Sequence, residues 1–197
     1  MLGIAFFALV VGLWLGPVDH AVIKPFLLCL TPAQQSTGIV VAASFALPVY
    51  FLMFLIETQI RTSAAPNGVL SVQFAFSQAR MKEILAGWNP QQLNMMLYQL
   101  GTDNLFIPLY STALAMCCLH YGQRGHMAYR VASLQYLAAA FDFAEGLLVL
   151  PVLFTNAHFI WSDDLVYLSG LCAVLKFVFI GIGIVYSVRQ YRAIKRE

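Results

Sequence analysis

Three ionisable side chains stand inside apolar sequence, where a charge is costly. Asp142 and Glu145 lie within the apolar stretch 131–154, and Lys176 lies within the apolar stretch 163–187. A single such charge at a bilayer centre costs roughly 3 kcal/mol on insertion scales, so an unpaired copy would be hard to keep. We therefore expect Lys176 to pair with Asp142, with Glu145 in reach of the same lysine.

Counting residues supports this pairing if both stretches are membrane-crossing helices. Asp142 is 12 residues before Phe154, and Lys176 is 11 residues after Leu165. At 1.5 Å per residue, each charge lies about 17 Å below the same membrane surface. Glu145 follows Asp142 by three residues, which places both carboxylates on one helix face.

Two further carboxylates, Glu57 and Asp103, are expected to approach from the same side of the membrane. The candidate cluster or pocket therefore contains Asp142, Glu145, Lys176, Glu57 and Asp103. Buried ionisable groups of this kind serve proton transfer and ligand binding. The competing interpretation is a salt bridge that only locks two helices together, and the sequence leaves both open.

The composition is that of a membrane protein. Hydrophobic residues make up 60% of the 197 residues and charged residues 10%, where a soluble domain carries about 25% charged residues. The net charge of +2 gives no reason to expect a nucleic-acid partner. We expect one transmembrane domain over residues 1–197 and no separate soluble domain.

The apolar runs predict an all-α polytopic membrane helix bundle of about five spans, four strong and one short at the N-terminus. The expected spans are 2–16, 38–60, 103–121, 131–154 and 163–187. The first is interpreted as a retained helix, because it lacks the positive start and the cleavage site of a secretory signal. Residues 17–37, interrupted by prolines, are expected to form a connector.

The segment 69–102 is expected to lie in the membrane interface. Its apolar residues, including Phe74, Met81 and Trp88, recur at helical spacing opposite polar ones, as in an amphipathic surface helix. Asn89-Pro90 has the chemistry of a helix start, which predicts a second short helix ending near Leu100.

Basic residues set the expected orientation. Lys and Arg in short loops favour the cytoplasmic side, and Arg189, Arg192, Lys195 and Arg196 end the chain. We therefore expect an integral protein of a plasma membrane, or of an inner membrane of a bacterium or organelle, with its C-terminus on the cytoplasmic or equivalent side.

No common catalytic or metal-binding motif is present in the sequence. The four cysteines form no CxxC pair, and the histidines fall at span ends or in loops, which argues against a haem held inside the bundle. No catalytic residue, metal or cofactor is predicted, although a bound lipid or quinone would suit the intramembrane cluster.

One family resemblance rests on three short motifs: residues 79–88 (ARMKEILAGW), 103–110 (DNLFIPLY) and 142–146 (DFAEG). Together they resemble a family of small, uncharacterised bacterial multi-pass membrane proteins, over about half the chain. The resemblance implies a helical membrane fold and no particular activity. The positions that match the family pattern are Trp88, Asp103, Tyr110, Asp142 and Glu145.

Two functional hypotheses follow. The first is a non-enzymatic accessory, assembly or stabilising subunit of a larger membrane complex, with membrane lipids and other proteins, or further copies of itself, as partners. The second is a protein that binds a lipid, quinone or pigment at the Asp/Glu/Lys cluster, with isomerase-like proton chemistry as its enzymatic form. The sequence slightly favours the first, because it shows no reaction motif.

Overall fold

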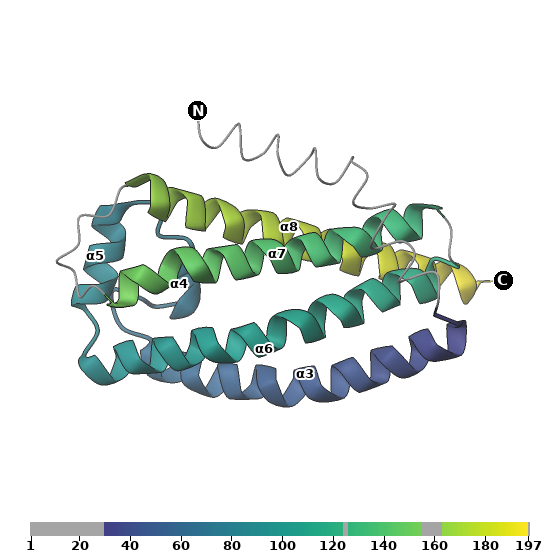
Figure 1. Cartoon of the computed structure of the whole chain (residues 1–197), viewed down its shortest axis with the longest axis horizontal. Helices are drawn as coiled ribbons and strands as arrows, with labels where there is room; N and C mark the ends of the chain where they lie inside the picture. The colour runs from purple at the N-terminus through teal and green to yellow at the C-terminus, as the bar shows by residue number, and fades with distance from the viewer. Residues whose placement is uncertain (1–29, 124–125, 155–162, 197) are drawn as a thin grey trace. The chain divides into compact units, whose positions relative to one another are not determined.

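The computed structural model describes residues 30–123, 126–154 and 163–196, which contain six α-helices and no strand (Figure 1). The helices are α3 (Pro32–Ile60), α4 (Val69–Gln73), α5 (Gln78–Ala86), α6 (Pro90–Tyr121), α7 (His126–Phe154) and α8 (Asp163–Ile194). The all-helical class expected from the sequence is confirmed over these residues. The expected first span, 2–16, lies outside them.

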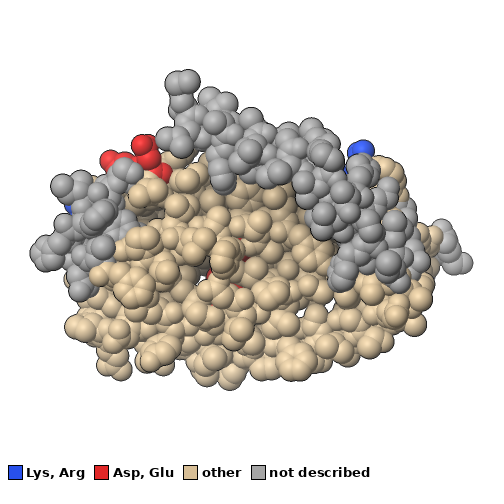
Figure 2. Space-filling model, viewed as in Figure 1, with Lys and Arg blue, Asp and Glu red and all other residues tan. Residues whose placement is uncertain are grey.

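Three of the described helices are long and apolar enough to cross a membrane: Pro32–Ile60, His126–Pro151 and Asp163–Ile194. The face seen in Figure 2 accordingly shows few charged atoms over its described part. Both observations support a membrane protein. The α6 helix, which contains the expected third span, is not among the three, so the count of five spans stays a prediction.

The start of α3 corrects the expected connector. The helix begins at Pro32, whereas we expected it to begin near residue 38. The Thr31 N–H donates to Gln34 Oε1 at 2.7 Å, and the Gln34 N–H donates to Thr31 Oγ1 at 3.2 Å. This reciprocal capping, with proline at the first helical position, starts a helix, so Thr31-Pro32 was wrongly taken as an interruption.

A second correction concerns α6. The sequence suggested a short helix ending near Leu100 and a new span from Asp103, but Pro90–Tyr121 is one helix. The polar residues at the expected break bond back to their own helix: Thr102 Oγ1 donates to the Tyr98 carbonyl at 2.8 Å, and Asn104 Nδ2 donates to the Leu100 carbonyl at 3.0 Å. These hydrogen bonds satisfy the two polar side chains, so the helix continues through them.

The expected surface helix is divided in two. Between α4 and α5 the backbone of Phe76 has φ of 51°, which a continuous helix does not allow. Ser77 then caps α5, because its side chain accepts a hydrogen bond from the Arg80 N–H at 3.3 Å. Helical spacing alone did not reveal this break.

The chain forms two compact units, and each long helix contributes residues to both. Unit 1 comprises Met1–Ser44, Leu109–Ala139 and Phe177–Glu197, and unit 2 comprises Phe45–Pro108 and Ala140–Lys176. Each unit has its own buried core.

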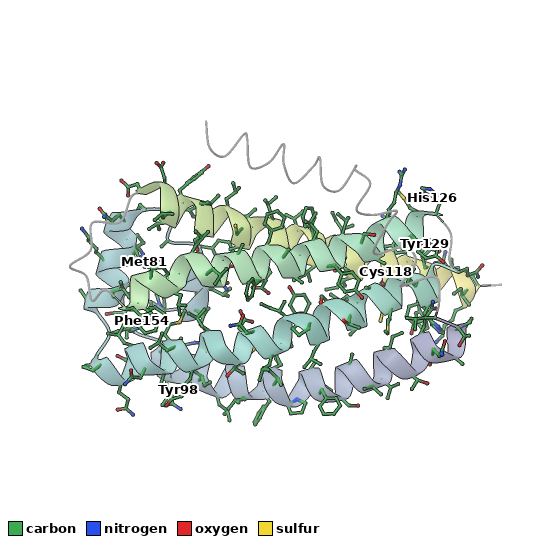
Figure 3. The ribbon with its side chains drawn as sticks, viewed as in Figure 1. Met81, Tyr98, Cys118, His126, Tyr129 and Phe154 are labelled. Atoms are coloured by element: carbon green, nitrogen blue, oxygen red, sulfur yellow. The ribbon has the colours of Figure 1, made fainter. Side chains whose placement is uncertain are left out.

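The described core of unit 1 is built from small residues of α6 and α7. Its buried members are Ala115, Cys118, Leu119, Ala128, Val131 and Ala132, with Tyr129 packed against them. Figure 3 shows Cys118 on α6 and Tyr129 on α7. Cys118 Sγ also lies 3.4 Å from Ser187 Oγ of α8. Small side chains allow such close helix packing.

Unit 2 buries two of the three apolar residues that we expected at the membrane interface. Met81 and Trp88 belong to its apolar core, while Phe74 stays 40% exposed. Trp88 Nε1 donates to the Ile60 carbonyl at 2.7 Å, which ties the residue after α5 to the end of α3. The backbone N–H of Gln78 donates to Asp163 Oδ1 at 2.8 Å, which joins α5 to the start of α8. The apolar face of α5 therefore packs inside unit 2.

Close packing at Gly183 gives a matched test of unit 1. A Cβ atom at Gly183 would clash with the side-chain amide of Gln135, which donates to the Val131 and Phe179 carbonyls. A Cβ atom at Gly181 would have no neighbour within 4 Å. We expect Gly183→Ala to reduce the free energy of unfolding by about 1–3 kcal/mol.

The control is Gly181→Ala, which should change that free energy by less than about 1 kcal/mol. Denaturant titration in detergent micelles measures both. Equal effects of the two substitutions would contradict the packing of Gly183 against Gln135.

Candidate functional site

The ammonium group of Lys176 is shared by two carboxylates inside unit 2. Lys176 Nζ donates to Asp142 Oδ1 at 2.6 Å and lies 2.7 Å from Glu145 Oε2. Asp142 is 6% exposed, Glu145 3% and Lys176 3%. The pairing expected from spacing is present, and both acids take part in it.

Helix geometry explains this arrangement. Asp142 and Glu145 are three residues apart on α7, so their side chains leave the same helix face about one turn apart. Lys176 comes from α8, and its long apolar stem carries the charge across to both acids. Ion pairs this short and this buried hold two helices together strongly, because separating them would leave bare charges in an apolar interior.

Asp103 of α6 belongs to the same electrostatic environment. It interacts with Asp142 and with Lys176, and Glu145 also interacts with Asp103. Cys172, one turn before Lys176 on α8, interacts with Glu145 and Lys176. Two carboxylates therefore contact Lys176, and Asp103 and Cys172 lie within electrostatic range of it.

Buried polar atoms without hydrogen-bond partners lie on two of the helices that carry this cluster. Gln99 is one turn before Asp103 on α6, and Ser169 is two turns before Lys176 on α8. They are 5% and 2% exposed. Gln99 Oε1 and Ser169 Oγ have no hydrogen-bond partner among the described residues, and neither has the Oε1 atom of buried Gln73. Buried polar atoms without partners are uncommon in native proteins and call for an explanation.

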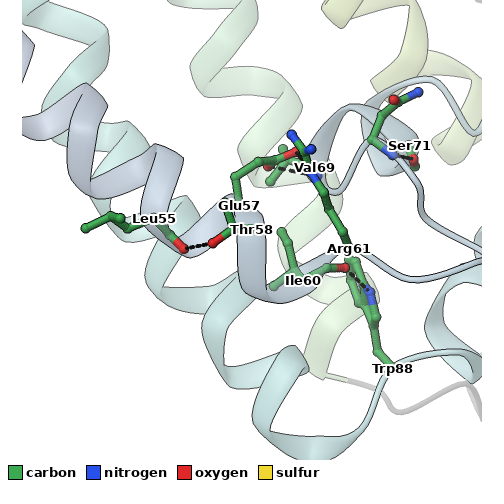
Figure 4. Close-up of polar contacts among 9 residues, drawn as sticks. Leu55, Glu57, Thr58, Ile60, Arg61, Val69, Ser71 and Trp88 are labelled. Carbon is green, nitrogen blue, oxygen red and sulfur yellow. Dashed lines mark hydrogen bonds and ion pairs between the residues drawn. The ribbon is translucent and has the colours of Figure 1, made fainter.

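Glu57, which we expected near the other acids, is engaged elsewhere in unit 2. Its Oε2 atom accepts a hydrogen bond from the Val69 N–H at 3.2 Å, and its Oε1 atom lies 4.0 Å from Arg61 (Figure 4). Gly68 has φ of 50°, and a Cβ atom there would clash with the Glu57 carboxylate. These contacts give Glu57 a structural part in fixing the loop that leads into α4.

The buried polar residues Gln99, Gln73 and Ser169 were not predicted from the sequence. A signal was available on α6, where the inward-facing residues Met96, Gln99, Asp103, Ile107 and Tyr110 recur every three or four positions. The expected break near residue 101 concealed this pattern. Tyr110 belongs to unit 1, whereas the other residues of the family-like pattern, Trp88, Asp103, Asp142 and Glu145, belong to unit 2.

Within the described residues, no group of three or more His, Cys, Asp or Glu side chains is arranged to hold a metal ion. Comparison with known proteins adds no assignment: no protein-family model, no curated protein and no solved structure matches the chain. The site is therefore interpreted from its own chemistry.

Removing the lysine tests how strongly the cluster depends on it. Lys176→Met would leave Asp142 and Glu145 buried without their cation, so we expect a loss of about 3–5 kcal/mol in the free energy of unfolding. Exposed Arg61, which lies 4.0 Å from half-buried Glu57, supplies the control, since Arg61→Met should cost less than about 1 kcal/mol.

Denaturant titration in detergent micelles gives both values, and the triple variant Asp142→Asn, Glu145→Gln, Lys176→Met should recover part of the loss. A Lys176→Met protein as stable as the Arg61→Met protein would show that the ion pairs do not hold unit 2 together.

Proposed function

We propose that this chain is an integral membrane protein that binds a small lipophilic ligand, such as a lipid, quinone or pigment, at the acid and lysine cluster of unit 2. One observation supports this over a purely structural role. A single buried lysine contacts two buried carboxylates, Asp142 and Glu145, and lies within electrostatic range of a third, Asp103.

A helix lock would need only one of these acids. Asp142 at 2.6 Å already neutralises Lys176, and the further carboxylates, buried Glu145 and half-buried Asp103, add a cost of desolvation. Carboxylates in excess of the one lysine are therefore unfavourable for the stability of the fold. They are useful where a proton or a ligand must be bound and released, because such groups respond to what occupies the site.

The proposal is a binding function, without an assigned catalytic residue. Glu145 is the acid best placed to exchange a proton with a bound molecule, because it shares Lys176 with Asp142 and also interacts with Asp103. Isomerase-like proton chemistry would require Glu145 to transfer its proton to the ligand. No second group with the opposite role is identified, so binding is the simpler proposal.

The accessory-subunit hypothesis keeps one specific observation in its favour. The α3 helix exposes large apolar side chains along its length, including Val40, Phe45, Leu47, Phe51 and Phe54. Such a surface suits lipid and also suits another membrane protein. The exposed basic residues Arg189, Arg192, Lys195 and Arg196 fit either hypothesis, and they support a C-terminus on the cytoplasmic side.

Native mass spectrometry with an absorption spectrum, on protein extracted gently from its own membrane, distinguishes the two functions. We expect a bound small molecule of defined mass on the unaltered chain. The triple variant Asp142→Asn, Glu145→Gln, Lys176→Met should still fold, because it removes the lysine together with both carboxylates that contact it, which costs far less than removing the lysine alone. It should lose the bound molecule.

Arg61→Met is again the control and should keep the ligand. Stoichiometric protein partners without a small molecule, together with an unaltered complex in the triple variant, would instead identify an accessory subunit.

A further inference from the structure

We propose that the ligand carries a protonated amine on an apolar body, and that the amine binds beside Glu145 and Asp103. This inference rests on the proposed binding function and names the class of ligand. It comes from the charge and the hydrogen-bonding capacity of the residues around Lys176.

The charge of the cluster favours a cation. With all its groups ionised, the cluster of Lys176, Asp142, Glu145 and Asp103 has one positive and three negative charges. Burial disfavours such an imbalance, most strongly at Glu145, which is 3% exposed, so a proton or a positively charged ligand would stabilise the cluster. A protonated amine would neutralise one carboxylate and leave Lys176 with Asp142.

The hydrogen-bonding groups favour a donor. The Oε1 atom of Gln99 is an acceptor only, and the Ser169 hydroxyl accepts as well as donates. Both atoms are buried without a partner among the described residues. A primary ammonium group offers three N–H donors, whereas a quinone offers carbonyl acceptors and would add to the surplus.

The helix faces place these groups together. On α6, Gln99 precedes Asp103 by one turn. On α8, Ser169 precedes Lys176 by two turns, and Cys172, which interacts with Glu145, lies between them. These residues therefore form a polar zone along the inward faces of α6, α7 and α8 within unit 2.

Apolar residues of the unit 2 core adjoin this polar zone. Met96, Val149 and Val166 lie one turn from Gln99, Glu145 and Ser169 on the same three helices, and all three belong to the apolar core of unit 2. The polar zone would contact the cationic head of such a ligand, and the adjoining apolar residues would contact its apolar body. Figure 2 shows red acidic atoms at the bottom of an opening in the tan face, and every described Asp and Glu belongs to unit 2.

The test uses the full chain in lipid nanodiscs and three probes with the same apolar body: dodecylamine, dodecanol and dodecanoate. We expect dodecylamine to raise the unfolding temperature saturably by about 3 °C or more, and the two other probes to have no saturable effect. Equal responses to dodecylamine and dodecanol would show hydrophobic partition only and would overturn the inference.

Two substitutions localise the site. Ser169→Ala, a small change, and Glu145→Gln should each weaken dodecylamine binding by about tenfold, the loss expected for one hydrogen bond to a charged group. The control Glu83→Gln, at an exposed acid of α5, should leave binding unchanged. Ser169→Ala keeps the test informative if Glu145→Gln fails to fold, and unchanged binding in Ser169→Ala would overturn the inference.

The outcome also separates this inference from the proposed function. A neutral small molecule found by native mass spectrometry, with no response to dodecylamine, would retain the binding function and overturn the amine. No co-purified molecule and no response to any probe would overturn both.

Discussion

The ion pairs between Lys176 and its two carboxylates are the constraint on which the inner part of unit 2 depends. At 2.6 and 2.7 Å they fix α8 against α7, and in an apolar interior neither helix can shift without exposing a bare charge. The apolar residues of the neighbouring core therefore pack against two helices that are held in fixed positions relative to each other. Trp88 and Met81 pack into that core, and the Trp88 hydrogen bond to Ile60 brings the end of α3 to it.

The sequence predicted this interaction because a charge in an apolar helix is costly unless an opposite charge pairs with it. Lys176 and Asp142 lie at matching distances from the ends of their helices, and a three-residue spacing adds Glu145 to the same face. The all-helical fold followed from apolar runs of membrane-spanning length. These predictions depend on helical periodicity and on the cost of burying charge, both of which act locally along the chain.

The predicted and observed structures differ where a local sequence pattern is compatible with two structures. Thr31-Pro32 starts a helix instead of interrupting one, because Gln34 completes the cap. Thr102 and Asn104 are polar yet stay helical, because they bond to carbonyls one turn back. Glu57 binds the Val69 N–H across a loop of the chain, a contact that no spacing rule predicts. Gln99 became recognisable as an inward-facing residue only once α6 was known to be continuous.

The two units differ in the charged residues that they contain. The described charged residues of unit 1 are all basic: Arg130, Arg189, Arg192, Lys195 and Arg196. Its buried polar contacts use neutral groups, such as Gln135 with the Phe179 carbonyl and Cys118 with Ser187. Every described carboxylate belongs to unit 2. The described carboxylates that could neutralise a buried cation are therefore found in unit 2, while the neutral contacts of unit 1 serve helix packing.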